Sequence, residues 1–144
     1  MPLYFAYGSN MDAERLRERI DHVQVTGVGS VSGYDLRFNK RSIDGSGKAN
    51  IVQRADVAVE GVLFEVSAAQ LAKLDRFEKG YHRAPVAVVV NGATQNATTY
   101  IADADQIDDN LTPTMEYMQL IMRGAERFGL SEGYRHRLAQ RSPG

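Results

Sequence analysis

The segment from Val23 to Val66 constrains the fold more than any other part of this 144-residue chain. Most of it has the pattern of β-strand, and Tyr34, Leu36 and Phe38 alternate with polar residues, so one face is expected to be buried. Glycine inside a strand marks a bulge or a close approach of two backbones. Such glycines interrupt the segment at Gly27, Gly29 and Gly33. The pattern predicts a mostly antiparallel, glycine-bent sheet, which can curl into a small barrel.

The first residues predict a buried strand that runs into a turn and then a helix. Leu3 to Tyr7 is a short apolar and aromatic run, and Gly8-Ser9-Asn10 ends it. The residues from Met11 to Ile20 have helical spacing, and either Asn10 or Asp12 can serve as the N-cap.

Two local signals define the middle of the chain. Ser67-Ala68-Ala69-Gln70 has the form of a capping box, so a helix should begin there. It should end near Glu78, because Gly80 follows. Further on, Asn91-Gly92 predicts a tight hairpin turn between strands over residues 84–90 and 94–101.

The last third predicts two more helices. Pro113 suits the first turn of a helix over residues 114–128 that Gly129 ends, and Ser131 begins a final helix to about Gln140. We find no repeat and no linker, so residues 1–144 are expected to form one α+β domain with helices packed outside the sheet.

Composition excludes several classes of protein. Lys plus Arg is 17 and Asp plus Glu is 18, without the basic excess of a general nucleic-acid binder. The absence of cysteine excludes disulfides, thiolate nucleophiles and cysteine zinc sites. The first residues lack a signal-peptide pattern, and no apolar run is long enough to span a membrane. We therefore expect a cytoplasmic protein that binds neither nucleic acid nor membrane.

The turn at Tyr7-Gly8-Ser9-Asn10 is a candidate anion site. Backbone N–H groups point out of a strand-to-helix turn near the positive end of the following helix, where a carboxylate can bind. Gly8 would let a ligand approach the backbone closely. A simple turn capped by Asn10 is the alternative that this pattern alone leaves open.

Glu78 is a candidate catalytic carboxylate. It falls within the apolar stripe of its helix, which is formed by Leu71, Leu74 and Phe77. A carboxylate that faces the core has strong partners or a raised pKa, and a raised pKa suits a general acid or base. Alternatively, Glu78 points outward from the last turn and pairs with Arg76 or Arg83. Tyr81 follows closely, and its hydroxyl group would bind a substrate or orient Glu78, unless it only packs at a strand entrance.

Three segments, in this order, resemble the γ-glutamylcyclotransferases and their avirulence-induced-gene-like relatives. Residues 4–11 (YFAYGSNM) resemble the N-terminal signature of that family. Residues 74–81 (LDRFEKGY) resemble its L-D-x-x-E-G stretch, which holds the catalytic glutamate, and residues 117–138 resemble its C-terminal helical segment. Lys79 departs from the pattern, because the family often has glycine directly after the glutamate. The end of the helix, and so the direction of Glu78, depends on this position.

The resemblance implies an enzyme that releases 5-oxoproline from a γ-glutamyl compound, with a free amine or amino acid as the second product. It assigns the general acid/base to Glu78 and a place in the pocket to Tyr117. The residues that would bind the α-carboxylate of the substrate are Tyr7, Gly8, Ser9 and Asn10. No metal and no cofactor are implied, because the substrate's own α-amino group is the nucleophile. A homodimer is compatible with the family.

Two questions stay open at the level of sequence. The substrate is a γ-glutamyl amino acid, a γ-glutamyl amine or a γ-glutamyl-tagged biosynthetic intermediate, and the loops over residues 41–48 and 103–110 are candidates for selecting the leaving group. The alternative function is a non-catalytic module that binds a small carboxylate or a partner protein. An inward-facing Glu78 argues against that alternative, because a binding module does not need it.

Overall fold

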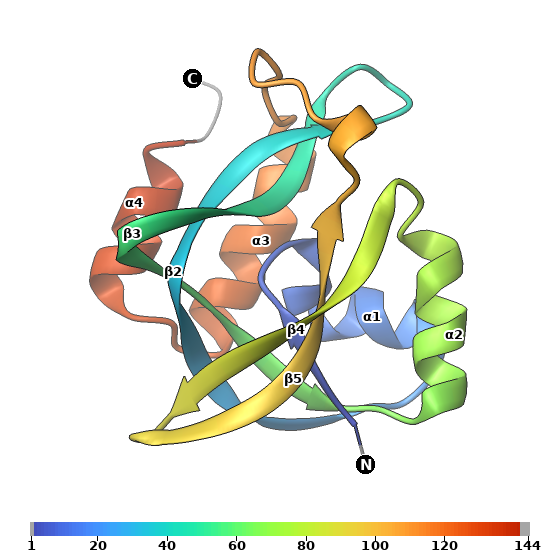
Figure 1. The fold of residues 1–144 in the computed structure, drawn as a ribbon, viewed down its shortest axis with the longest axis vertical. Helices are drawn as coiled ribbons and strands as arrows, with labels where there is room; N and C mark the ends of the chain where they lie inside the picture. The colour runs from blue at the N-terminus through green and yellow to red at the C-terminus, as the bar shows by residue number, and fades with distance from the viewer. Residues whose placement is uncertain (1, 142–144) are drawn as a thin grey trace.

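Five strands close into a barrel in the computed structural model, which describes residues 2–141 (Figure 1). The strands, in the spatial order β1-β3-β2-β4-β5, are Leu3–Ala6, Gly47–Glu65, Gln24–Arg41, Tyr81–Val90 and Ala93–Ala102. Neighbouring strands are antiparallel except for the closing pair, in which Tyr4 of β1 lies beside Thr98 of β5 in parallel. The α+β class and the mostly antiparallel sheet are confirmed, and the sheet is closed.

The long strands β2 and β3 bend together midway along their length (Figure 1). The pairing of Ser32 with Ala58 is followed by that of Tyr34 with Gln53, so residues 54–57 of β3 stand opposite Gly33. Gly33 has a φ of 81° there. An unequal number of residues on two paired strands bends them and increases their twist, which is how a two-stranded ribbon turns the corner of a barrel.

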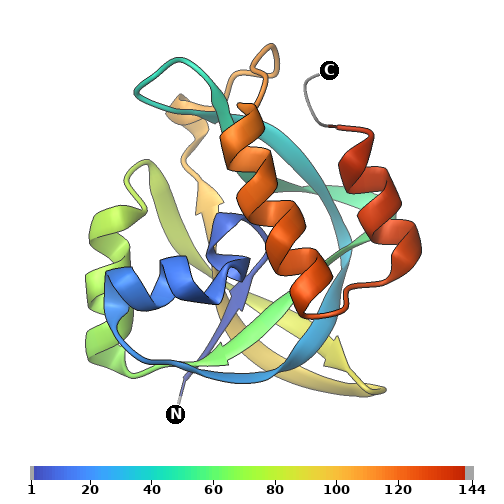
Figure 2. The same cartoon turned by 180° about the vertical axis from the view of Figure 1, so that it is seen from behind.

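Within residues 2–141, four helices flank the barrel: α1 Ala13–Ile20, α2 Ala68–Phe77, α3 Met115–Arg127 and α4 Glu132–Ala139. The same part of the chain contains two short 3-10 turns, η1 Ser9–Met11 and η2 Ala104–Gln106. Figure 2 shows α1 and α2 together on one side, with α3 crossing the barrel between them and α4. Within residues 2–141, no helix combines the length and the apolar character that crossing a membrane requires.

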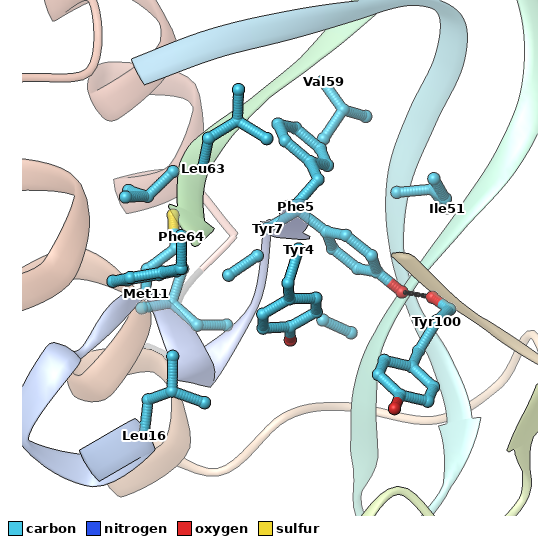
Figure 3. Packing of buried hydrophobic residues seen from close by; sticks show 14 of the residues in the cluster. Tyr4, Phe5, Tyr7, Met11, Leu16, Ile51, Val59, Leu63, Phe64 and Tyr100 are labelled. Carbon is cyan, nitrogen blue, oxygen red and sulfur yellow. Dashed lines mark hydrogen bonds between the residues drawn. The ribbon is translucent and has the colours of Figure 1, made fainter. Parts of the chain in front are cut away.

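The core occupies the barrel interior and the layer between the barrel and the helices. β1 is buried on both faces, which explains its uniformly apolar sequence. Phe5 and Phe64 are fully buried, as is Met11 at the end of η1 (Figure 3). Helix α3 approaches η1 closely, because Gly124 has no side chain; a Cβ at that position would lie 2.7 Å from the Met11 Cβ.

The expected helix over residues 11–20 begins later than the sequence suggested. Residues 9–11 form η1, and α1 begins at Ala13 with Asp12 as its N-cap, whose side chain accepts the Arg15 N–H. Asn10 does not cap the helix, because its side chain is buried and bonded to Tyr4 and Glu78. Similarly, Pro113 precedes the N-cap Thr114 of α3 and does not lie in the first turn.

Helix α2 begins and ends close to the predicted residues. The capping box of Ser67 and Gln70 is present in both directions. The helix ends at Phe77, Glu78 is its C-cap, and Gly80 follows with a φ of 84°. One expectation was wrong: the Phe77 side chain does not belong to the buried stripe, because the residue is 50% exposed and its ring lies on the outside beneath the Arg19 guanidinium.

The hairpin predicted at Asn91-Gly92 is confirmed. Both residues have positive φ, 50° and 80°, as a type I′ turn requires. The turn joins β4 to β5, which pair over their whole length from Tyr81 with Ala102 to Val90 with Ala93.

Candidate active site

One end of the barrel contains a hollow with about 310 Å³ of empty space, including its open mouth. We call it the inner hollow. The first turn after β1 and the ends of β3, β4, β5, α2 and α3 contribute its walls. The residues that line it are Tyr4, Tyr7, Gly8, Ser9, Asn10, Ala49, Glu78, Tyr81, Tyr100 and Tyr117. This set includes every site residue expected from the sequence, and its members come from five separate parts of the chain.

Among the described residues that line the inner hollow, Glu78 is the only carboxylate. Its side chain is 14% exposed. Glu78 Oε1 lies 2.7 Å from Asn10 Nδ2 and 3.9 Å from Arg19 Nη1. Burial raises the pKa of Glu78, while Arg19 and then the Asn10 hydrogen bond act in the opposite direction. A carboxyl group in this environment can exchange a proton closer to neutral pH than an exposed glutamate can.

The end of α2 turns Glu78 toward the hollow. As the C-cap, Glu78 has φ −100° and ψ 51°, which is outside the helical region, and its N–H bonds back to the carbonyl groups of Leu74 and Asp75. Gly80 then adopts positive φ, so the chain reverses into β4 even though Lys79 replaces the glycine that often follows the glutamate. The outward pairing of Glu78 with Arg76 or Arg83 is not observed.

Asn10 holds Glu78 in place. Its Nδ2 group donates to the Tyr4 hydroxyl at 3.0 Å and to Glu78 Oε1 at 2.7 Å. The residue is 4% exposed. Its Oδ1 atom is buried and has no hydrogen-bond partner among residues 2–141. A buried acceptor without a donor is costly, so the N–H group of a ligand would stabilise it.

The turn after β1 brings backbone amides to the wall of the hollow. The N–H groups of Met11 and Asp12 bond to the carbonyl groups of Gly8 and Ser9, whereas the first N–H groups of such a turn have no partner within it. A Cβ on Gly8 would lie 3.1 Å from the Ala49 Cβ, so this wall has little space for a side chain. The N-terminus of α1 is capped by Asp12, whose side chain accepts the Arg15 N–H.

Tyrosines form most of the remaining wall, and two of them hold the backbone. Tyr7 donates its hydroxyl proton to the Tyr100 carbonyl at 2.5 Å (Figure 3), and Tyr81 donates to the Ala49 carbonyl at 2.7 Å. Tyr117 accepts the Ala49 N–H at 3.0 Å. Burial raises the pKa of Tyr117 to about 12 and holds the pKa of Tyr7 well above its ordinary value. These phenols therefore stay neutral at physiological pH.

Several residues at the site carry little signal in the sequence. Tyr4 lies in the opening motif and was not assigned a role there. Ala49, Tyr100 and Arg19 reach the site only through long-range pairing of strands and packing of α1 on α2. The loop after β2 contributes Ser42 and Ile43 to a second hollow beside Glu78, whereas the described part of the loop over residues 103–110 lines neither hollow.

Across the part of the chain that the structure describes, no group of three or more His, Asp or Glu side chains is placed to hold a metal ion.

Known proteins are similar to this chain in sequence and in fold. A model of the family described as "Gamma-glutamyl cyclotransferase, AIG2-like" matches residues 4–119, which include every residue lining the inner hollow. The γ-glutamylcyclotransferases of Bos taurus and Homo sapiens are 27% and 28% identical over 148 residues, covering 98% of this chain and 79% of each relative. A solved γ-glutamyl cyclotransferase superposes with a TM-score of 0.90 at 27% identity, over 99% of this chain and 88% of the other.

The fold and these relatives define an enzyme of the cyclotransferase class. The chain belongs to the γ-glutamyl cyclotransferase, AIG2-like family.

Proposed function

We propose that this enzyme converts a γ-glutamyl compound into 5-oxoproline and a free amine or amino acid, with Glu78 as the general acid/base. The observation that carries the proposal is the buried Glu78 carboxylate, which has a raised pKa and is held against the turn after β1 through Asn10. In this arrangement, one end of a small substrate lies at backbone amides and the other at a proton acceptor.

The substrate supplies its own nucleophile. The α-amino nitrogen attacks the γ-carbonyl carbon and forms the C–N bond of a five-membered ring, and the bond from that carbon to the leaving nitrogen breaks. The protein must hold the γ-glutamyl chain folded, since well-oriented intramolecular reactions reach effective molarities of about 10⁵ M or more. The residues proposed to bind the α-carboxylate in the folded pose are Tyr7, Gly8, Ser9 and Asn10.

Proton transfer is the task of Glu78. Only the neutral amine attacks, so one proton must leave the ammonium group before the ring closes, and Glu78 accepts it. A second proton leaves the ring nitrogen after attack. The leaving nitrogen gains two protons if it departs as an ammonium ion, so the balance closes without water. Glu78 can return its proton to that nitrogen as the intermediate collapses.

Neutral donors at the site would stabilise the oxyanion of the tetrahedral intermediate. Hydrogen-bond donors aimed at a developing negative charge lower the barrier most in a site shielded from water. We assign this role to backbone N–H groups of the same turn that the α-carboxylate leaves free, because the hydroxyl protons of Tyr7 and Tyr81 already bond to carbonyl groups. The pocket tyrosines, including Tyr117, then shape the hollow and exclude water.

Product analysis tests this proposal. The wild-type enzyme is incubated with γ-glutamyl amino acids, γ-glutamyl amines and γ-glutamyl-tagged intermediates, and 5-oxoproline is detected by mass spectrometry. We expect 5-oxoproline from at least one substrate and very little from Glu78→Gln. A wild-type enzyme that releases none from the whole panel would refute the function. A Glu78→Gln variant with near-normal release would refute the role of Glu78 alone.

A further inference from the structure

A second hollow opens directly outside the inner one. We call it the outer hollow; it contains about 660 Å³ of empty space, including its mouth. The two hollows share four lining residues: Ser9, Glu78, Tyr81 and Tyr117. A molecule bound with its reacting carbon beside Glu78 can therefore extend from one into the other.

The outer hollow is strongly basic on a protein that is nearly neutral overall. Within residues 2–141, one acidic residue, Glu78, lines it together with five basic ones: Arg15, Arg19, Lys40, Lys48 and Lys79. The net charge of the whole chain is only −1. The basic residues come from α1, β2, β3 and the turn after α2, so the fold gathers them from separate elements.

Most of these cations lack a carboxylate partner. Arg19 lies 3.9 Å from Glu78, while the side chains of Arg15, Lys40, Lys48 and Lys79 form no ion pair within residues 2–141. By contrast, Lys73 on the outer side of α2 lies 2.8 Å from Asp21. The Arg15 Nε group is buried and has no hydrogen-bond partner in the described chain.

Two of the cations lie over tyrosine rings that line both hollows. Lys48 Nζ is 4.2 Å from the centre of the Tyr117 ring, and Lys40 Nζ is 5.2 Å from that of Tyr81. Both tyrosines also line the inner hollow. The ammonium groups therefore lie where the two hollows meet, at the place that the leaving portion of a γ-glutamyl substrate would occupy. We call this place the passage.

The cations repel one another in this arrangement, which disfavours their charged forms. Burial and then Arg15 lower the pKa of Lys48, and Arg19 and Lys40 act in the same direction. Asp44 on the neighbouring loop opposes them. Like charges that share a partly buried site repel, and a bound anion removes that cost.

We propose that the outer hollow selects γ-glutamyl substrates whose leaving portion carries two or more negative charges, such as an acidic amino acid. This inference rests on the function proposed above. A leaving amine without a carboxylate would leave the four unpaired cations without a partner, and an ordinary amino acid brings one carboxylate. An acidic amino acid brings two, one for each of the ammonium groups at the passage.

The matched pair γ-glutamyl-glutamate and γ-glutamyl-glutamine tests the inference, because the two differ only by a carboxylate in place of a carboxamide. We expect kcat/KM to favour γ-glutamyl-glutamate by about tenfold or more, as for a hydrogen bond between charged groups. The preference should shrink as salt is added, because ions screen partly exposed charges. Equal kcat/KM values for the two dipeptides would overturn the inference and leave the proposed function intact.

Variants test whether the lysines of the outer hollow cause the preference for γ-glutamyl-glutamate. Lys48→Gln and Lys40→Gln should each reduce the ratio of the two kcat/KM values, whereas Lys73→Gln removes a lysine outside both hollows and should leave the ratio unchanged. A merely structural role would lower both kcat/KM values together and keep their ratio, which would contradict the inference.

Binding gives a readout that does not depend on turnover. Calorimetric titration of both dipeptides into Glu78→Gln should show tighter binding of γ-glutamyl-glutamate by a similar factor. Equal affinities would overturn the inference. If the wild-type enzyme releases no 5-oxoproline while γ-glutamyl-glutamate still binds more tightly, the proposed function fails and the anion-selective hollow remains.

Discussion

The last turn of α2 carries two carboxylates on opposite sides, and their environments differ. Asp75 lies on the solvent side, 44% exposed, where Arg83 grips it with two hydrogen bonds of 2.9 and 2.7 Å. Those bonds are the main reason that the pKa of Asp75 is lowered. Glu78 lies on the barrel side, where burial raises its pKa. Both residues are acidic and close in sequence, yet their pKa values shift in opposite directions. The side of the helix on which a carboxylate lies therefore determines the direction of its pKa shift.

The largest expected effect is a loss of turnover that follows substitution of Glu78 and does not follow substitution of Asp75. Glu78→Gln should lower turnover by about 10²–10⁴-fold, the usual contribution of a positioned general acid or base. Asp75→Asn should stay within a few-fold of the wild-type rate, because Asp75 does not line the inner hollow and an asparagine oxygen can still accept the hydroxyl proton of Tyr100, which does. Release of 5-oxoproline under saturating substrate measures both. Comparable losses of turnover in the two variants would contradict the assignment of catalysis to the carboxylate on the barrel side of α2.

A smaller effect should come from the groups that hold Glu78. The Asn10 hydrogen bond and the Arg19 charge both lower the pKa of Glu78, so their removal should raise it further. Asn10→Ala and Arg19→Gln should therefore shift the acidic limb of the kcat/KM profile to higher pH. On that limb we expect about tenfold lower kcat/KM for Asn10→Ala, since a hydrogen bond to a charged group is lost.

Arg127→Gln is the control for this pH shift. Arg127 is exposed and pairs with Glu14 at 3.7 Å, away from the hollow. Its profile should coincide with that of the wild-type enzyme. An acidic limb that does not move in Asn10→Ala or Arg19→Gln would show that another group controls it.

Stability should respond in the opposite sense to activity at Glu78. Because its native pKa is raised, the folded state is favoured by protonation at low pH and loses that advantage as pH rises through the native pKa. Glu78→Gln should then increase the free energy of unfolding by about 0.5–2 kcal/mol at neutral pH. The gain should fade as pH falls to the pKa of an unfolded glutamate, which is about 4.3. Urea unfolding at several pH values measures it.

The smallest expected effect belongs to the solvent side. Asp75→Asn removes an exposed ion pair and should cost about 0.2–1 kcal/mol at neutral pH, as is usual for such pairs. The pKa of Asp75 is lowered in the native state, so its contribution is present above the unfolded pKa and lost as pH falls through the native pKa. A larger cost at low pH than at neutral pH would contradict this assignment.

Local signals in the sequence predicted the elements that local chemistry determines. The capping box at Ser67 and the positive-φ turn at Asn91 are both observed, because each depends only on neighbouring residues. The opening motif predicted site residues as well. Two of them, Tyr7 and Asn10, line the same hollow as Glu78.

Features that depend on long-range packing could not be predicted in this way. Closure of the barrel needs β1 to reach β5, a pairing that no local pattern encodes. The helical stripe gave the right direction for Glu78 but the wrong burial for Phe77, because the helix ends at Phe77 and Glu78 turns inward as its C-cap. The clustering of cations at the outer hollow could not be predicted from the sequence either, because Arg15 and Lys48 lie on separate elements.

One titration tests most directly whether Glu78 is the buried acid/base. The side-chain carboxyl carbons of glutamate and aspartate are labelled with ¹³C, and NMR follows Glu78 and Asp75 in the free enzyme beside the pH profile of kcat/KM. We predict a Glu78 midpoint above that of an ordinary glutamate, equal to the pKa of the acidic kinetic limb, and an Asp75 midpoint below that of an ordinary aspartate. A Glu78 midpoint at or below the ordinary value, or a kinetic limb that follows another group, would contradict this assignment.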